Sequence, residues 1–451
     1  MSEIIPNPAR GKEVFDLDRK FVFHSWSAQG QISPLPVAGG KGSYFWDFDG
    51  NKYLDFSCQL VFTNIGFQHP KVIEAIKKQA DTLATVAPQV ANDVRSEAAM
   101  RIVELAGSKF AKVFFTNGGA DGIENAIRMA RLFTGRHKIL SFYRSYHGNT
   151  SAAISATGDP RRWPNEFAYG HVHFFGPFAY RSAFWAKSEE EECARALEHL
   201  ENTIIFEGAK TIAAILIESV VGTAGVLIPP KGYLEGVRAL CDKYGILWIG
   251  DEVMSGFGRT GKWFAYQHSN VEPDLIVFAK GVNSGYVPLG GVVISHPVSE
   301  SFNDRVFPGG LTYSGHPLAC AAAVATIDVM KEEKIVEQAK QIGEEVLGPG
   351  LRELATKHKV IGEVRGLGVF WALDLVTDRN SRAPLAPYGG TSPAMSTLVA
   401  ECKKRGLMPF TNFNRLHVVP PCNITADEAR KGIQILDAAF ATISHHYEGK
   451  D

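Results

Sequence analysis

The sequence is poor in cysteine and in clustered charge. Its six cysteines are scattered through 451 residues with no Cys-x-x-Cys pair, which argues against both a zinc site and a disulfide framework. The formal net charge is −1, and no basic block occurs. Nothing in the composition therefore favours nucleic acid or an anionic membrane as a partner.

The sequence also lacks long apolar runs. None approaches the roughly 18 residues that a membrane-spanning helix needs, and the first residues have neither the basic nor the apolar region of a signal peptide. We therefore expect a cytoplasmic protein. Hydrophobic residues make up 45% and charged residues 21%, as in ordinary globular proteins, and the length allows two or three domains.

Two apolar runs each end in a charged residue. Residues 246–250 lead into Asp251, and residues 275–279 lead into Lys280. Short runs of this kind predict buried strands of a parallel sheet. Because ligands of open α/β sheets lie outside the carboxyl ends of the strands, we expect Asp251 and Lys280 to reach one crevice. The alternative is a structural salt bridge at the end of the sheet.

A glycine-rich turn follows another apolar run. Residues 112–116 predict a strand, residues 117–120 (Asn-Gly-Gly-Ala) predict a turn, and a helical pattern follows. Such a turn is a potential anion site, because free backbone N–H groups and the helix dipole point outward. The turn matches neither Gly-x-Gly-x-x-Gly nor a P-loop. Because Gly-x-Gly-x-x-Gly is the fingerprint of dinucleotide binding, its absence here disfavours a dinucleotide-dependent oxidoreductase.

Residues 251–265 and 273–281 carry a family resemblance. The first segment reads Asp-Glu-Val-Met-Ser-Gly-Phe-Gly-Arg-Thr-Gly-Lys-Trp-Phe-Ala, and the second reads Pro-Asp-Leu-Ile-Val-Phe-Ala-Lys-Gly. Together they resemble the signature of class III (ω-type) aminotransferases. The resemblance extends from about Trp26 to the C-terminal helix. It implies an α/β enzyme of fold type I that uses pyridoxal 5'-phosphate.

The resemblance also implies a domain plan. A large cofactor-binding domain, residues 61–334, holds a mostly parallel seven-stranded sheet flanked by helices. A smaller α+β domain combines residues 1–60 with residues 335–451.

The chemistry of this cofactor requires an amine and an acid. The amine holds the cofactor aldehyde as a Schiff base, and the acid keeps the pyridine nitrogen protonated. By resemblance, Lys280 and Asp251 have these catalytic roles, and the released Lys280 amine moves the substrate proton. Val253 and Tyr146 are expected to pack on the two faces of the ring. His147 is interpreted as a structural residue with a local hydrogen bond.

Three further residues match positions that bind the cofactor phosphate. Backbone N–H groups of Gly119 and Ala120 are expected to donate to it. Ala120 stands where the family commonly has serine, so we expect weaker cofactor retention and unchanged chemistry. Thr312 matches a threonine that donates to the phosphate of the neighbouring subunit, which implies a homodimer with shared active sites, with a tetramer as the alternative.

The substrate pocket departs from the family pattern. Val61, Phe62 and Thr223 match pocket-lining positions, and Val61 stands where several ω-transaminases have a large aromatic residue. Pro409 and Phe410 occupy the neighbourhood of the usual carboxylate-binding arginine. Arg415 is the nearest arginine, and we expect it to bind the acceptor carboxylate in a bidentate pair. The alternative for Arg415 is a solvated surface side chain.

Three local patterns concern the smaller domain. Residues 44–55 alternate around an Asp-Gly turn and predict a hairpin. A helix starting near Pro317 is expected to continue to Ala355 with a break at residues 348–350, Gly-Pro-Gly. Residues 425–428, Thr-Ala-Asp-Glu, predict a capping box at the start of the last helix.

These observations predict an aminotransferase with a ping-pong mechanism. It moves an amino group from an amine or ω-amino acid donor to a keto acid acceptor, pyruvate in our prediction. An aminomutase or decarboxylase on the same scaffold is the alternative, because the cofactor stabilises whichever carbanion is presented. We expect no metal, since His171 and His173 have no acidic or thiol ligand near them in the sequence.

Overall fold

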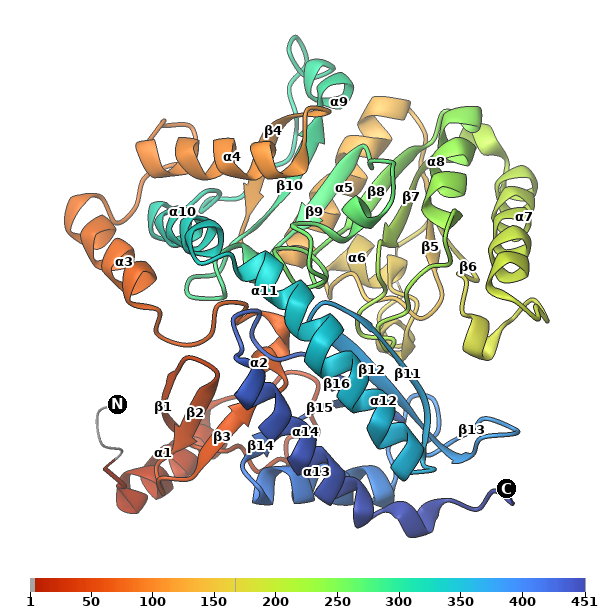
Figure 1. The fold of residues 1–451 in the computed structure, drawn as a ribbon. Helices are drawn as coiled ribbons and strands as arrows, with labels where there is room; N and C mark the ends of the chain where they lie inside the picture. The colour runs from red at the N-terminus through yellow and green to blue at the C-terminus, as the bar shows by residue number, and fades with distance from the viewer. Residues whose placement is uncertain (1–4, 167, 451) are drawn as a thin grey trace.

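The structure, a computed structural model, describes residues 5–166 and 168–450. Figure 1 shows a large sheet with helices on both faces in its upper part and smaller sheets with further helices in its lower part. The first helix, α1 (Pro8–Phe21), and the last long helix, α14 (Ala426–Ala441), both lie in the lower part. Within the described ranges, no helix has the length and apolar character needed to cross a membrane.

The large sheet has seven strands in the order β4-β10-β9-β8-β7-β5-β6. Neighbours from β9 to β6 pair in parallel, whereas β10 is antiparallel to both β9 and β4. The predicted mostly parallel seven-stranded sheet is thus confirmed. Its strands are β4 (Phe110–Thr116), β5 (Lys138–Phe142), β6 (His171–Phe174), β7 (Ile212–Glu218), β8 (Leu247–Asp251), β9 (Leu275–Phe278) and β10 (Gly290–Ser295).

Helices cover both faces of this sheet. Ala214 and Leu216 of β7 belong to the core under α5 and α6, whereas Ile215 and Ile217 belong to the core on the other face. Because neither face meets solvent, every residue of β7 and β8 is buried and the strands are continuously apolar. The covering helices are α5 (Gly119–Thr134), α6 (Ser151–Ala156), α4 (Asp93–Ala106), α7 (Glu189–Glu207), α8 (Tyr233–Tyr244) and α10 (Pro317–Glu332).

The lower part joins the two ends of the chain. One sheet has the order β1-β2-β3-β14, in which β3 pairs in parallel with β14. A second sheet has the order β11-β12-β16-β15, with β13 paired to β12. The strands are β1 (Val37–Lys41), β2 (Tyr44–Asp47), β3 (Lys52–Asp55), β11 (Ile361–Leu367), β12 (Phe370–Asp378), β13 (Ala383–Pro384), β14 (Leu407–Met408), β15 (Phe410–Asn412) and β16 (Arg415–Val418).

The remaining helices connect or cover these sheets. They are α1 (Pro8–Phe21), α2 (Cys58–Val61), α3 (Pro70–Thr82), α9 (His296–Glu300), α11 (Ile335–Ile342), α12 (Gly348–Lys357), α13 (Pro393–Lys404) and α14 (Ala426–Ala441). The predicted capping box is confirmed at α14. The Glu428 backbone N–H donates to Thr425 Oγ1 at 3.2 Å, and the Thr425 N–H donates to Glu428 Oε2 at 3.1 Å.

The predicted hairpin is also confirmed. β2 and β3 pair antiparallel, with Tyr44 opposite Leu54. Asp47 Oδ1 accepts from the backbone N–H groups of Asp49 and Asn51, at 3.0 and 2.8 Å. Gly50 takes a φ of +89°, which a residue with a side chain rarely adopts.

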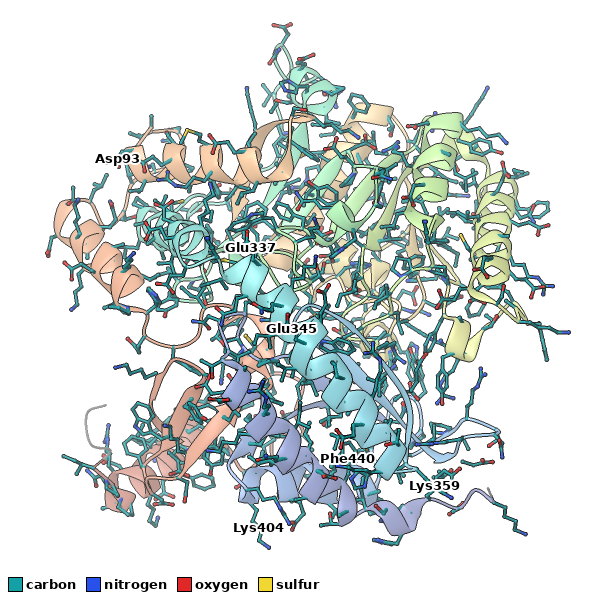
Figure 2. The ribbon with its side chains drawn as sticks, viewed as in Figure 1. Asp93, Glu337, Glu345, Lys359, Lys404 and Phe440 are labelled. Atoms are coloured by element: carbon teal, nitrogen blue, oxygen red, sulfur yellow. The ribbon has the colours of Figure 1, made fainter. Side chains whose placement is uncertain are left out.

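The predicted helix break at residues 348–350 is wrong. The chain breaks at Lys334, which has left-handed φ and ψ of 52° and 41°, between α10 and α11. Residues 343–347 form a π-helix that continues into α12 without a break, and Pro349 follows it directly, so the helix accommodates the proline by a local change of winding. Residues 335–357 thus form one continuous helix, which runs from the large sheet to the lower part. Figure 2 shows Glu337 and Glu345 along this helix, and both residues are exposed.

Candidate active site

A cavity of about 460 Å³ lies at the carboxyl ends of the central strands. It brings together most of the predicted site residues, although they come from six separate stretches of the chain. The cavity also includes Ser25 and Trp26, which the sequence analysis did not assign to the site. The predicted residues that line it are Phe62, Gly119, Ala120, Tyr146, Thr223, Asp251, Val253 and Lys280.

Lys280 stands two residues beyond β9 in a strained conformation. Its φ is +47°, in the left-handed region that side chains with a Cβ avoid, and such strain persists only where the surroundings impose it. Burial lowers the pKa of the Lys280 amine to about 8, although the nearby Asp251 carboxylate opposes this shift. The neutral amine is therefore far more accessible near neutral pH than that of an ordinary lysine.

Asp251 is the last residue of β8 and is 3% exposed. Its Oδ2 lies 2.7 Å from His147 Nδ1, and its Oδ1 accepts from the Val253 backbone N–H at 3.0 Å. The interpretation of His147 as a locally bonded residue is wrong, because its partner lies 104 residues away in the sequence. His147 fixes the Asp251 carboxylate, as a buried partner does for a functional acid.

Glu218 is a site residue that the sequence analysis missed. It ends β7 directly beside Asp251 in the parallel register and lines the cavity. Its Oε1 accepts from the Tyr146 N–H at 3.2 Å, and its Oε2 accepts from the Gly222 N–H at 2.7 Å. Burial, followed by the charge of Asp251, raises the pKa of Glu218. The signal was present, because Glu218 also ends an apolar run at the same edge of the sheet.

Tyr146 is held from two directions. The Arg161 guanidinium lies 3.5 Å from the centroid of its ring, and Trp26 makes an edge contact at 6.4 Å between ring centroids. Arg161 in turn forms ion pairs with Asp159. A cation on one face of an aromatic ring restrains its orientation. Neither Arg161 nor Trp26 was predicted from the sequence.

The start of α5 forms a cradle for an anion. The first turn of a helix leaves its backbone N–H groups without intrahelical partners, and Gly118, Gly119 and Ala120 line the cavity at this turn. A Cβ on Gly119 would lie 2.9 Å from Val253 Cγ2, so only glycine lets the turn approach Val253 this closely. No atom lies within 4 Å of a Cβ placed on Gly118.

Of the two residues predicted as pocket-lining in the segment 58–62, only one lines the cavity. Phe62 lines the cavity, whereas Val61 is 1% exposed and packs in the core with Val220 and Met254. Cys58, Gln59 and Val61 all have positive φ. Arg259, from the signature loop, holds this strained segment by donating to Asn64 Oδ1 at 2.8 Å and to Cys58 Sγ at 3.0 Å.

Besides Val61, two further predicted residues do not line the cavity. Thr312 is exposed on the surface of the chain. Arg415 lines a neighbouring pocket and donates from Nη1 to the Ala224 carbonyl at 2.8 Å. The alternative that Arg415 is a solvated surface side chain is wrong, because the residue is only 6% exposed.

The residues present fit pyridoxal phosphate. The cradle at α5 suits the phosphate, because the first turn leaves its N–H groups without intrahelical partners and Gly118 leaves open space beside them. Asp251 supplies a fixed carboxylate for a protonated ring nitrogen, and Lys280 supplies an amine of lowered pKa for the aldehyde. The two demands of the cofactor are met in one cavity.

Comparisons with known proteins agree with this geometry. The family model described as aminotransferase class-III matches residues 26–440. The 5-aminovalerate aminotransferase of Pseudomonas aeruginosa is 35% identical, with 91% of this chain and 94% of that protein covered. The taurine–pyruvate aminotransferase of Bilophila wadsworthia is 32% identical, with 96% and 98% covered.

A solved structure extends the agreement to three dimensions. The taurine:2-oxoglutarate aminotransferase of Bifidobacterium kashiwanohense, in complex with pyridoxal phosphate and glutamate, superposes with a TM-score of 0.94 at 44% identity. The match covers 99% of this chain and 100% of that chain. The chain therefore belongs to the class-III aminotransferases and is a pyridoxal phosphate-dependent enzyme that transfers an amino group to a keto acid.

Proposed function

We propose that Lys280 and Asp251 are the catalytic pair of this aminotransferase. The observation that supports this most strongly is that an amine of lowered pKa and a buried, fixed carboxylate line one cavity beside an anion cradle. Bound pyridoxal phosphate supplies an electron sink for the carbanion of the substrate. Lys280 Nζ binds the cofactor aldehyde between turnovers and, once released, carries the proton of the substrate carbon.

The other residues bind and orient. Asp251, held by His147, keeps the proton on the ring nitrogen. Tyr146 and Val253 pack on the ring, and the N–H groups of Gly119 and Ala120 bind the phosphate. Offset contact with an aromatic ring contributes about 0.5 to 1.5 kcal/mol beyond burial, so Tyr146 supports cofactor retention more than chemistry.

We propose a donor whose amine ends a short chain that carries an acidic group. The relatives act, by their names, on 5-aminovalerate and taurine, which share this feature. Pyruvate is the proposed acceptor, and 2-oxoglutarate is a second candidate because it is named for the 44% identical structural relative. Phe62 and Thr223 line the cavity where this chain would lie, Val61 supports that wall from the core, and Arg415 is the proposed carboxylate contact.

The substrate proposal is tested by incubating the holoenzyme with ω-amino acids, taurine, diamines or arylalkylamines and each keto acid. We expect one alanine or glutamate to form per donor consumed. Product formation without any keto acid would instead indicate an aminomutase or a decarboxylase. For Arg415, we expect Arg415→Ala to lower kcat/KM for pyruvate, and a loss below twofold would remove Arg415 from substrate binding.

We propose a homodimer in which Thr312 serves the neighbouring active site. Its exposed position away from the cavity of its own chain supports this role. Light scattering should give twice the chain mass, or four times for a tetramer. Thr312→Ala should weaken cofactor binding, whereas a monomer with full activity would contradict the shared site.

We also propose the domain plan and compartment predicted from the sequence. The parallel pairing of β3 with β14 supports a smaller domain built from residues 1–60 and 335–451, apart from residues 61–334. The six cysteines are free and buried, which supports a reducing compartment such as the cytoplasm.

A further inference from the structure

A second pocket of about 440 Å³ lies beside the cofactor cavity and is rich in arginine. We name it the arginine pocket and define it by Arg144, Arg162, Arg181 and Arg415, with Asp374 as its one lining acid. Its walls also contain aromatic residues, including Phe178 and Tyr388. Of these four arginines, only Arg415 is predicted as a site residue from the sequence, because they come from separate stretches of the chain.

Two of the four arginines have acidic partners. Arg181 Nη2 lies 2.7 Å from Asp374 Oδ1, and Arg162 Nη1 lies 2.7 Å from Glu166 Oε2. Asp374 is shared further, because Arg365 Nη2 lies 3.5 Å from its other oxygen. The single acid that lines the pocket therefore already faces two guanidinium groups.

The other two arginines have no acidic partner among the described residues. In the part of the chain that the structure describes, the Arg415 guanidinium donates to two neutral carbonyls, those of Asn412 at 3.1 Å and Ala224 at 2.8 Å, although Arg415 is only 6% exposed. The Arg144 guanidinium lies 5.3 Å from the centroid of the Phe178 ring, and in residues 5–166 and 168–450 it has no hydrogen bond or ion pair. Arg144 also takes a φ of +64°.

The positive charges in this pocket oppose one another. Burial lowers the pKa of Arg415 to about 10. The Asp374 carboxylate opposes this shift, and the charges of Arg365 and Arg144 add to it. Burial also lowers the pKa of Arg144. Arg181 and Arg365 add to this shift, whereas Tyr388 and the Asp374 carboxylate oppose it. Asp374 also faces Arg181 and Arg365, so its one charge compensates these buried cations only in part. An oxyanion in the pocket would add the missing negative charge through charge-assisted hydrogen bonds.

The arginine pocket is coupled to the cofactor cavity through one loop. Arg415 binds the Ala224 carbonyl, and Asn412 Nδ2 donates to the Thr223 carbonyl at 2.8 Å, while Thr223 itself lines the cofactor cavity. Arg144 and Glu218 also line a common narrow gap of about 20 Å³. A change in the position of Arg144 or Arg415 would thus reach both the cavity wall and the acid beside Asp251.

We propose that the arginine pocket is an anion-binding site, separate from the cofactor cradle, for a small carboxylate, sulfonate or other oxyanion. Two sources share this chemistry. One is a free acid that binds the pocket and acts on the cavity through residues 220–226. The other is the acidic end of a substrate whose reacting end lies in the cavity, in which case the inference rests on the proposed function.

Binding is tested with the holoenzyme, in which the phosphate cradle is filled. Isothermal titration with sulfate and with succinate should show one saturable site per chain. Arg144→Gln should raise the dissociation constant at least tenfold, whereas Arg352→Gln, which changes an exposed arginine on α12, should not. Since Arg144 has no acidic partner, Arg144→Gln should fold with an unchanged or higher melting temperature, and Arg415→Gln is the second variant.

Kinetics then separates the two sources. If the anion is the acidic end of a substrate, Arg144→Gln raises KM for the keto acids, and sulfate competes with them. If the anion is a free acid, sulfate changes kcat with both acceptors equally, and Arg144→Gln abolishes the effect. An absence of saturable binding, or equal binding by wild type and Arg144→Gln, overturns the site. Saturable anion binding in the calorimeter by a holoenzyme that shows no transamination would overturn only the proposed function.

Discussion

The cofactor cavity and the arginine pocket lie beside each other but differ in how their buried charged groups are paired. In the cavity, Asp251 is bonded to His147 and to a backbone N–H, and Glu218 accepts two backbone N–H groups. In the arginine pocket, Arg144 and Arg415 have no acidic partner in the described part of the chain. The shared Asp374 charge compensates these two arginines only in part. A pocket with this excess of positive charge is suited to receive an anion.

The two sites also differ in whether their cations can lose a proton. Lys280 is the titratable cation of the cavity. The charges of Asp251 and Glu218 raise the pKa of its amine, and burial lowers this pKa by more. The arginines of the other pocket cannot lose their protons at neutral pH in the same way. Proton transfer is therefore confined to the cavity, and the arginine pocket can only bind.

The largest effect is expected from Lys280→Ala. Removal of the amine takes away both the cofactor attachment and the proton carrier, so kcat should fall about 10³-fold or more. Single-turnover measurements with a keto acid and a donor would show this loss. Lys262→Ala, which changes an exposed lysine of the signature loop, is the matched control and should keep wild-type kcat.

The next effect is expected from Asp251→Asn. The amide still accepts from the Val253 N–H but no longer carries the charge that keeps the ring nitrogen protonated, so kcat should fall about 10²-fold to 10³-fold. Steady-state kinetics at saturating cofactor would measure it. A fall below threefold would mean that the carboxylate only supports the fold.

A smaller effect with a defined sign is expected from Glu218→Gln. The Glu218 charge raises the pKa of Lys280, so its removal should lower that pKa further below about 8. In the apo chain, the rate of coupling to pyridoxal phosphate should rise with pH as the Lys280 amine loses its proton, with a midpoint near pH 8. The midpoint should move to lower pH in Glu218→Gln, and an unchanged or higher midpoint would contradict the electrostatic coupling.

The smallest effect is expected from Ala120→Ser. A hydroxyl at the start of α5 can add one hydrogen bond to a charged phosphate, worth about 1.5 to 3 kcal/mol at most. The dissociation constant for the cofactor should fall by roughly tenfold while kcat at saturating cofactor stays the same. Equilibrium dialysis of the apo chain gives the constant, and a change in kcat alone would contradict a role in retention.

Features that depend on local pattern and on strand ends could be predicted from the sequence. Asp251 and Lys280 could be placed together because parallel strands end at one edge of the sheet. Glu218 satisfied the same rule and was missed, since one acid at a strand end has no distinctive neighbour in the sequence. The break at Lys334 was missed because a glycine-proline pair is a stronger local signal than the left-handed lysine that tertiary packing imposes.

The arginine pocket could not be predicted from the sequence. Arg144 follows β5, Arg181 ends the short 3₁₀ helix Ala179–Arg181, and Arg415 begins β16, so only the folded chain brings them together. His147 likewise found its partner through folding. Long-range polar contacts of this kind have no periodicity that a sequence pattern can detect.

The most direct test concerns the amine at residue 280. The holoenzyme is reduced with borohydride, digested and analysed by mass spectrometry. One phosphopyridoxyl group per chain should be found on the peptide that contains Lys280, together with loss of the absorbance near 410 nm. An adduct on any other lysine, or none at all, would contradict the assignment of the active site.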